Sequence, residues 1–196
     1  KEASPQARVL DFVRTWLFWR MSLTFGLWWF AGAIIYVQIA PFLLEKGFDS
    51  TVTAKFVAIF GASNCLGRVG FGWLSDRIGS VRTYQLALVS CAVASTGFGA
   101  AEAFYLVAII AVLLGFGVGG VSAQLTFVSI DLFGTRAAGA LMGTVLALMG
   151  ILGAGGPLLS GAIYDAMQSY APAFYGGAAV FVLALIVSFG LRNGRG

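Results

Sequence analysis

One arginine, Arg68, stands inside a long apolar stretch and has the clearest potential for chemistry in this sequence. It lies eight residues before Asp76, which puts it about 12 Å inside the end of a helix that reaches that aspartate. A guanidinium keeps its proton inside proteins, and its planar donors match a carboxylate with two parallel hydrogen bonds. Arg68 could therefore hold an anionic substrate, pair with an acid from another part of the protein, or stay hydrated in a cavity.

Three further residues are weaker candidates for the same site. Asn64 precedes Arg68 by one helical turn, so the two side chains share a face. Gln124 is expected at a similar depth, where a hydrogen bond between helices is the alternative role. Trp28 lies next to Trp29 at mid-depth, away from the interfacial belts where tryptophan is commonest, and packing is the alternative there. We predict that Arg68, Asn64, Gln124 and Trp28 bind substrate.

The sequence holds little else that could do acid–base, nucleophilic or metal chemistry. It has no His, and its two cysteines, Cys65 and Cys91, both fall inside apolar runs. No disulfide, metal site or cofactor is therefore expected. Without a histidine, a cysteine–base pair or an acid inside an apolar run, we do not expect an enzyme.

The composition indicates that lipid, rather than water, surrounds most of the chain. Of the 196 residues, 59% are hydrophobic and only 10% are charged, against about 25% charged in soluble proteins. The mean hydropathy is +0.91. The net charge of +4 comes from basic residues that are scattered singly, so nucleic acid is not an expected partner. The expected surroundings are a lipid bilayer.

Six apolar stretches are long enough to cross that bilayer, which requires about 20 residues each. The stretches are Met21–Leu44, Thr53–Leu74, Thr83–Ala101, Ala103–Ile130, Ala137–Tyr164 and Ala166–Leu191. We therefore predict an all-α membrane protein with a six-helix transmembrane domain at residues 16–192. A cytoplasmic linker is expected at residues 1–15 and a cytoplasmic tail at residues 193–196.

The distribution of Lys and Arg predicts that both termini are cytoplasmic, in a plasma membrane or a bacterial inner membrane. The side of the termini would carry Lys1, Arg8, Arg14, Arg20, Arg77, Arg82, Arg136, Arg192 and Arg195. The opposite side would carry only Lys46 and Lys55. Residues 7–19 are expected to form a short amphipathic segment on the inner membrane surface.

The second and fifth predicted helices end in the same pattern of residues. The pattern G-x4-G-x3-D occurs at Gly67–Asp76 and again at Gly156–Asp165. One aspartate would face the cytoplasm and the other the outside, because the two helices run in opposite directions. This placement is typical of two inverted repeats of three helices, and chance in a glycine-rich sequence is the alternative.

The loop after the second predicted helix carries a specific charged motif. The stretch from Gly72 to Arg82, GWLSDRIGSVR, resembles the signature G-x-x-x-D-R-x-G-x-x-R of the major facilitator superfamily. Residues 131–139 and 155–161 resemble the loop before that family's eleventh helix and the outer end of that helix. The resemblance implies the C-terminal six helices of a twelve-helix transporter that works by alternating access, with the N-terminal half as a missing partner.

The charged residues around this loop are expected to form a cytoplasmic latch. Asp76 ends a helix, where the helix dipole disfavours an anion, so it needs a cation or the N-terminus of another helix. Asp131 could pair with Arg77 or Arg82. The alternative is that these charged residues only set the orientation of the protein in the membrane. The predicted latch consists of Asp76, Arg77, Gly79, Arg82, Asp131 and Arg136.

Residues 64–68, NCLGR, together with residues 38–41, QIAP, resemble the monocarboxylate transporters and the oxalate/formate antiporters. The resemblance implies that Arg68 holds the carboxylate of a small organic anion, moved by antiport or symport. Asn64 stands where animal monocarboxylate transporters have an aspartate, and Met149 is the nearest match to a lysine of the oxalate antiporters. The missing lysine makes a dicarboxylate less favoured than a monocarboxylate, and the missing aspartate leaves this half without a proton acceptor inside the membrane. The alternatives are an uncharged or drug-like solute, or a six-helix membrane fragment without transport activity.

Overall fold

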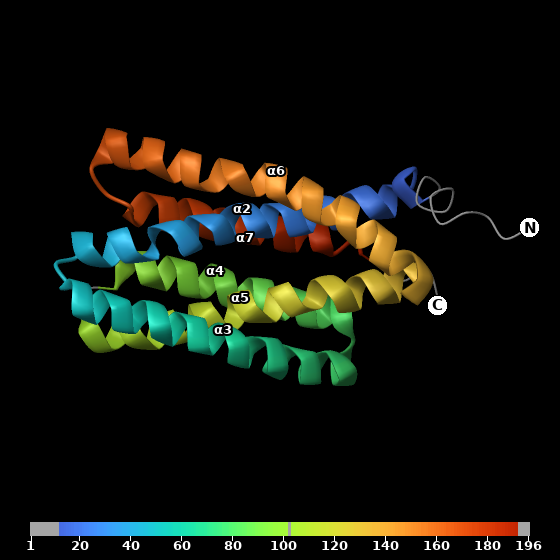
Figure 1. Cartoon of the computed structure of the whole chain (residues 1–196), viewed down its shortest axis with the longest axis horizontal. Coiled ribbons are helices and arrows are strands. Elements are labelled where there is room, and N and C mark those ends of the chain that lie inside the picture. Colours follow the sequence, from blue (N-terminus) through green and yellow to red (C-terminus); the bar gives the residue numbers. More distant parts are fainter. Residues whose placement is uncertain (1–11, 102, 192–196) are drawn as a thin grey trace, which may run out of the picture.

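The chain folds into helices that run side by side along the long axis of the molecule (Figure 1). The computed structural model describes residues 12–101 and 103–191, apart from the side chains of residues 136, 137 and 140. The helices of these residues are α2 (Trp16–Glu45), α3 (Ser50–Ile78), α4 (Ser80–Ala100), α5 (Phe104–Phe133), α6 (Thr135–Met167) and α7 (Ala171–Ser188). The all-α prediction with six helices is thus confirmed for the described part of the chain.

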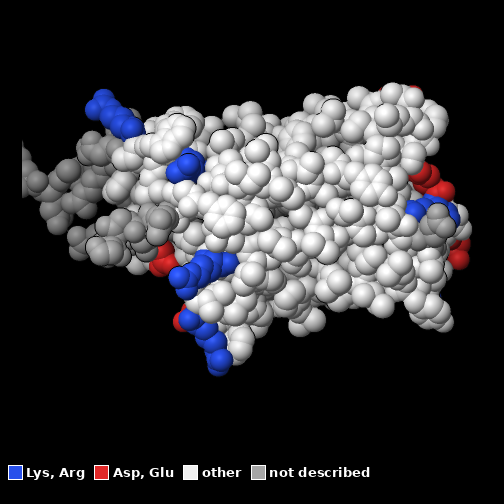
Figure 2. Space-filling model, turned by 180° about the vertical axis from the view of Figure 1, so that it is seen from behind, with Lys and Arg blue, Asp and Glu red and all other residues white. Residues whose placement is uncertain are grey.

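Four of these helices are long and apolar enough to cross a membrane. They are α2, α5, α7 and the part of α6 from Leu141 to Met167. On the face seen in Figure 2, Lys, Arg, Asp and Glu gather towards the two ends, with an uncharged belt between them. An uncharged belt of this kind is what the hydrocarbon core of a bilayer requires. The chain is therefore an integral membrane protein.

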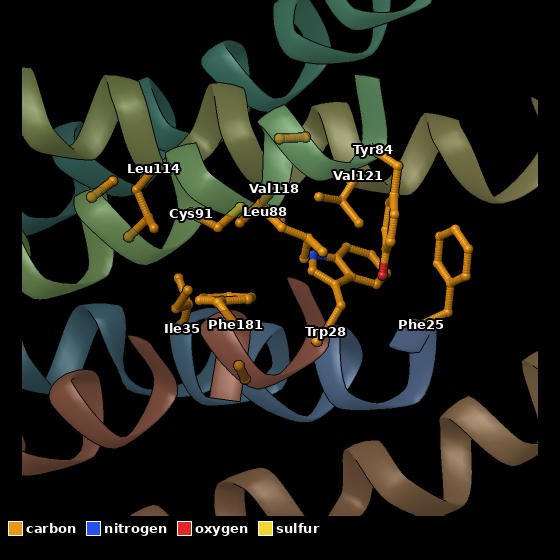
Figure 3. Packing of buried hydrophobic residues seen from close by; sticks show 14 of the residues in the cluster. Phe25, Trp28, Ile35, Tyr84, Leu88, Cys91, Leu114, Val118, Val121 and Phe181 are labelled. Atoms are coloured by element: carbon orange, nitrogen blue, oxygen red, sulfur yellow. The ribbon is translucent and has the colours of Figure 1, made fainter. Parts of the chain in front are cut away.

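Two helices, α2 and α5, organise the bundle. α2 packs mainly against α6 and α7, α5 packs mainly against α3 and α4, and α4 also packs against α7. The buried side chains between α2, α4, α5 and α7 form one core, part of which is seen in Figure 3. In that core the ring of Phe25 lies 4.4 Å from the ring of Tyr84, whose hydroxyl is 3.0 Å from Thr24 Oγ1.

The C-terminal end of α2 forms hydrogen bonds with two connections at the same end of the bundle, the one between α4 and α5 and the one between α6 and α7. The Lys46 ammonium donates to the carbonyl of Ala101, at the C-terminal end of α4, over 2.6 Å. The Glu45 carboxylate accepts from the backbone N–H of Tyr170, at the N-terminal end of α7, over 2.9 Å. Each charge has the sign that the helix dipole favours at its position. α2 is thus fixed to both α4 and α7.

The connections at the opposite end are shorter than the sequence predicts. Gly79 alone separates α3 from α4, and Gly134 alone separates α5 from α6, where loops at 75–82 and 131–136 were expected. Their dihedral angles, φ +88° with ψ 152° and φ +80° with ψ 159°, belong to a region that is essentially reserved for glycine. The loops were predicted too long because a helix can continue past the apolar core while its own hydrogen bonds satisfy the backbone.

The predicted surface segment at residues 7–19 overlaps the start of α2, which begins at residue 16, as the predicted transmembrane domain does. Trp16 to Trp19 form the first turn of α2, and the Thr15 hydroxyl caps that turn by accepting from the N–H of Phe18 over 3.3 Å. Residues 1–11 of the predicted linker and the predicted tail at 193–196 lie outside the described residues. Apolar side chains at Trp16 and Leu17 extend the first helix beyond the charge-free run that defined it in the sequence.

We predict that Gly67→Ala destabilises the protein, because α3 and α5 touch at this glycine. A Cβ atom at Gly67 would collide with the carbonyl oxygen of Phe116 on α5. Overpacking of this kind costs about 1–3 kcal/mol, so the melting temperature of the purified protein in detergent should fall.

The matched control is Gly61→Ala on the same helix, where an added Cβ has nothing within 4 Å. This change should raise the stability slightly, because alanine is the better helix former by up to about 1 kcal/mol. Equal melting temperatures for the two variants would show that the contact at Gly67 is not tight.

Candidate functional site

Arg68 lines a hollow of about 320 Å³ between α2 and α3. Its side chain is exposed in this part of the molecule, and Asn64, one turn earlier on the same helix, is 7% exposed. The lining residues are Tyr36, Ile39, Val57, Phe60, Gly61, Asn64 and Arg68. The structure therefore brings together the predicted pair of Arg68 and Asn64, and it gives them an apolar surround.

Tyr36 is a member of this hollow that the sequence reasoning missed. Asn64 Nδ2 donates to the Tyr36 hydroxyl over 2.9 Å. Because the hydroxyl oxygen accepts this bond, its own hydrogen can be donated to a third group. A cation, an amide and a phenol thus converge on one space. The signal was the spacing, since Tyr36 follows Trp29 by seven residues and so lies on the same face of α2.

Gln124 lies between α3 and α5 and forms hydrogen bonds between these helices, which is the alternative that the sequence left open. Its side chain is fully buried. The amide oxygen accepts from the Ser75 hydroxyl over 3.1 Å, and the amide nitrogen donates to the carbonyl of Phe71 over 3.1 Å. Both ends of the amide are thus used in joining the two helices, and Gln124 is not among the residues that line the hollow of Arg68.

Gln38 makes a comparable link on the other side of the bundle. Its amide nitrogen donates to the Ser160 hydroxyl over 2.8 Å, which joins α2 to α6. Its side chain is 6% exposed. The two buried glutamines therefore fasten the two largest contacts of the bundle, α2 with α6 and α3 with α5.

Trp28 both packs in the core and lines a second hollow. It is 2% exposed and lies near Tyr84, Leu88 and Val121 (Figure 3). The second hollow has a volume of about 310 Å³. Its lining residues are Trp28, Trp29, Ser122, Leu125, Leu146, Met149 and Gly150. Trp28 is thus shared between the core and a largely apolar space formed by α2, α5 and α6.

The predicted latch residues gather at the end of the bundle that carries Gly79 and Gly134. Gly79, Arg82 and Asp131 line a hollow of about 570 Å³ there. Asp131 accepts from the Ser80 hydroxyl over 2.5 Å, and the Arg77 guanidinium lies over the Trp73 ring at 4.0 Å from its centre. Asp76 is exposed in the last turn of α3. The side chain of Arg136 lies outside the described residues.

We predict that Gln124→Ala lowers the stability of the protein. The change leaves the buried hydroxyl of Ser75 without its acceptor, which costs about 1–3 kcal/mol. It also removes a second hydrogen bond from the carbonyl of Phe71, which keeps its helical bond within α3. The melting temperature in detergent should fall. Gln85→Ala, at a half-buried position on α4, serves as the control and should melt close to the wild type.

Comparison with known proteins identifies the family of this chain. The sequence model described as the Major Facilitator Superfamily matches residues 1–155. A search of curated proteins found no match. The match covers more than three quarters of the chain and agrees with the apolar helices of the bundle and with the motif from Gly72 to Arg82. The chain therefore belongs to the major facilitator superfamily, a family of membrane transporters and not of enzymes.

Proposed function

We propose that this protein forms the C-terminal half of a secondary transporter that moves a small monocarboxylate across the membrane by alternating access. The observation that carries the proposal is the exposed guanidinium of Arg68 in a hollow shared with Asn64 and Tyr36. A charge at this depth costs several kcal/mol in lipid unless a partner or water compensates it. A substrate carboxylate would compensate it with two charge-assisted hydrogen bonds.

The surroundings of Arg68 favour one carboxylate over two. The second hollow contains the thioether of Met149, with no Lys or Arg among its described lining residues. The hollow of Arg68 likewise contains no Asp or Glu among its described lining residues. A coupled proton would therefore be carried by the substrate or by the N-terminal half. This half supplies the anion site, and its partner half would complete the cavity wall.

We infer that α2–α4 and α5–α7 are inverted repeats, because equivalent glycines make equivalent contacts. A Cβ at Gly67 of α3 would collide with the carbonyl of Phe116 on α5, and one at Gly156 of α6 would collide with the carbonyl of Phe30 on α2. Gly67 and Gly156 occupy the first position of the repeated G-x4-G-x3-D pattern. In each case the second helix of one set touches the first helix of the other set.

The two buried glutamines, Gln38 and Gln124, also support an inverted repeat of α2–α4 and α5–α7. Gln38 and Gln124 are separated by the same number of residues as Phe30 and Phe116. Each glutamine joins the first helix of one set to the second helix of the other. Such repeats are common in secondary transporters, where rocking of one bundle against another opens the site to each side in turn. We further propose that both termini are cytoplasmic, in a plasma membrane or a bacterial inner membrane, from the excess of Lys and Arg at that end.

We propose that the latch closes the cytoplasmic end of the bundle, and Asp76→Asn tests this proposal in the full-length transporter. Removing the charge should weaken the cytoplasmic closure, so that inward-facing states become more populated. A Gly61→Cys reporter in the hollow of Arg68 should then react faster with a maleimide added from the cytoplasmic side. The control is Asp165→Asn, the equivalent residue at the opposite end. Unchanged labelling and transport in Asp76→Asn would leave Asp76 with a purely topological role.

Substitution of Arg68 tests the anion site in the full-length transporter. Arg68→Lys keeps the charge but loses the planar fork, and Arg68→Gln loses both. Each charge-assisted hydrogen bond is worth about 1.5–3 kcal/mol, which corresponds to roughly 10- to 150-fold in affinity. Monocarboxylate binding should therefore weaken in the lysine variant and nearly disappear in the glutamine variant.

The melting temperature of the same variants separates this role from a structural ion pair. If Arg68 pairs with an acid of the other half, Arg68→Gln leaves a buried carboxylate unpaired and lowers the melting temperature. Lost binding with an unchanged melting temperature supports the substrate site. Intact binding with a lowered melting temperature would refute it.

A further inference from the structure

The second hollow has an apolar character that the proposed anion site does not use. The indoles of Trp28 and Trp29, the side chains of Leu125 and Leu146, and the thioether of Met149 form its wall. The polar residue of the lining, Ser122, directs its hydroxyl to the carbonyl of Gly119 over 2.8 Å. The hollow therefore presents an apolar surface of the kind that binds the hydrocarbon part of a ligand.

The two hollows adjoin along one face of α2. Trp29 lines the apolar hollow and Tyr36 lines the hollow of Arg68, and their ring centres are 5.9 Å apart. Seven residues separate them, which corresponds to about 10 Å along a helix. Trp29 is also held from the side of α6, because its indole lies against Gly153, where a Cβ would collide with the ring. A fixed aromatic wall thus joins the charged space to the apolar one.

We propose that the two hollows bind a single amphipathic monocarboxylate. Its carboxylate lies at Arg68, and its apolar body, an alkyl or aryl chain about 10 Å long, lies along Trp29 in the second hollow. This inference rests on the proposed function, since it assigns the substrate class of the same site. It predicts a preference for carboxylates with a long apolar chain over short polar ones, because Arg68 supplies a positive charge in the first hollow and the described lining of the second hollow contains no Lys or Arg.

The chain length of the ligand is the variable to measure. In the full-length transporter, the straight-chain carboxylates acetate, butanoate, hexanoate, octanoate and decanoate are compared as competitors of a radiolabelled hexanoate. Each methylene that enters the apolar hollow should improve the apparent affinity about fourfold, the factor that corresponds to one buried methylene. The improvement should stop once the chain exceeds the length of the hollow.

Gly150→Leu fills the apolar hollow and provides the decisive variant. Gly150 lines that hollow, and a Cβ added there has nothing within 4 Å. The variant should lose at least tenfold more affinity for octanoate than for butanoate, relative to the wild type. The matched control is Gly176→Leu on α7, another helical glycine with nothing within 4 Å, which should keep the full dependence on chain length.

A second variant adds the missing charge. Met149→Lys places an ammonium in the wall of the apolar hollow. It should make octanedioate, which carries a carboxylate at each end, compete at least tenfold better than it does in the wild type. An unchanged rank order of octanoate and octanedioate in this variant would contradict the inference.

The outcomes distinguish this inference from the proposed function. If no carboxylate competes at all, the proposed function fails. If acetate and octanoate compete equally in an Arg68-dependent manner, the proposed function stands and the apolar subsite is refuted. If Gly150→Leu weakens all chain lengths by the same factor while Gly176→Leu does not, the hollow is a packing surface for the N-terminal half, and the inference is also refuted.

Discussion

The charge of Arg68, within the long helix α3, is the main physical constraint on the proposed site. The sequence places no Asp or Glu between Asp49 and Asp76, so no acid of the same helix lies at the depth of Arg68. A protonated arginine in hydrocarbon must be met by water, by an anion or by a polar wall. The amide of Asn64 and the phenol of Tyr36 supply part of that wall. The charge therefore requires a space on one side of α2 and α3 that water or an anion can enter.

Several other polar side chains inside the bundle do not face a hollow but form hydrogen bonds between helices. Gln38 and Gln124 are buried, and their hydrogen bonds run to neighbouring helices. The Thr24 hydroxyl reaches the carbonyl of Ala184 on α7 over 2.7 Å. Because an unsatisfied polar group costs more in lipid than in water, such bonds hold the helices in one register.

The sequence was sufficient to predict the six helices of the described chain and the pairing of Arg68 with Asn64 in one hollow. The length of the apolar runs predicts the helices, and the periodicity of a helix places Arg68 and Asn64 on the same face. The ends of the helices were less predictable, because the charge-free runs stop where the bilayer core stops while the helical hydrogen bonds continue to Gly79 and Gly134. A glycine that reverses the chain looks the same in the sequence as a glycine that packs against a neighbour.

The surroundings of the polar side chains inside the apolar helices could not be predicted from the sequence alone, for a related reason. Gln124 and Asn64 are both amides on apolar helices at similar depth, and only the tertiary packing places the first between helices and the second in a hollow. Tyr36 escaped notice because an aromatic residue in an apolar run reads as packing until its hydroxyl is seen to have a polar partner.

The arrangement of α2 indicates where movement in this protein has to occur. One face of α2 carries Trp29 and Tyr36 of the two hollows. Other positions of the same helix are fastened to three neighbours: Gln38 to α6, Lys46 to the end of α4, and Glu45 to the start of α7. A helix that is held at so many points cannot shift alone without breaking several buried or charge-assisted bonds. The wall of the proposed site is therefore rigid within this bundle, and the alternating access that we propose requires the bundle to move as a unit against its partner half.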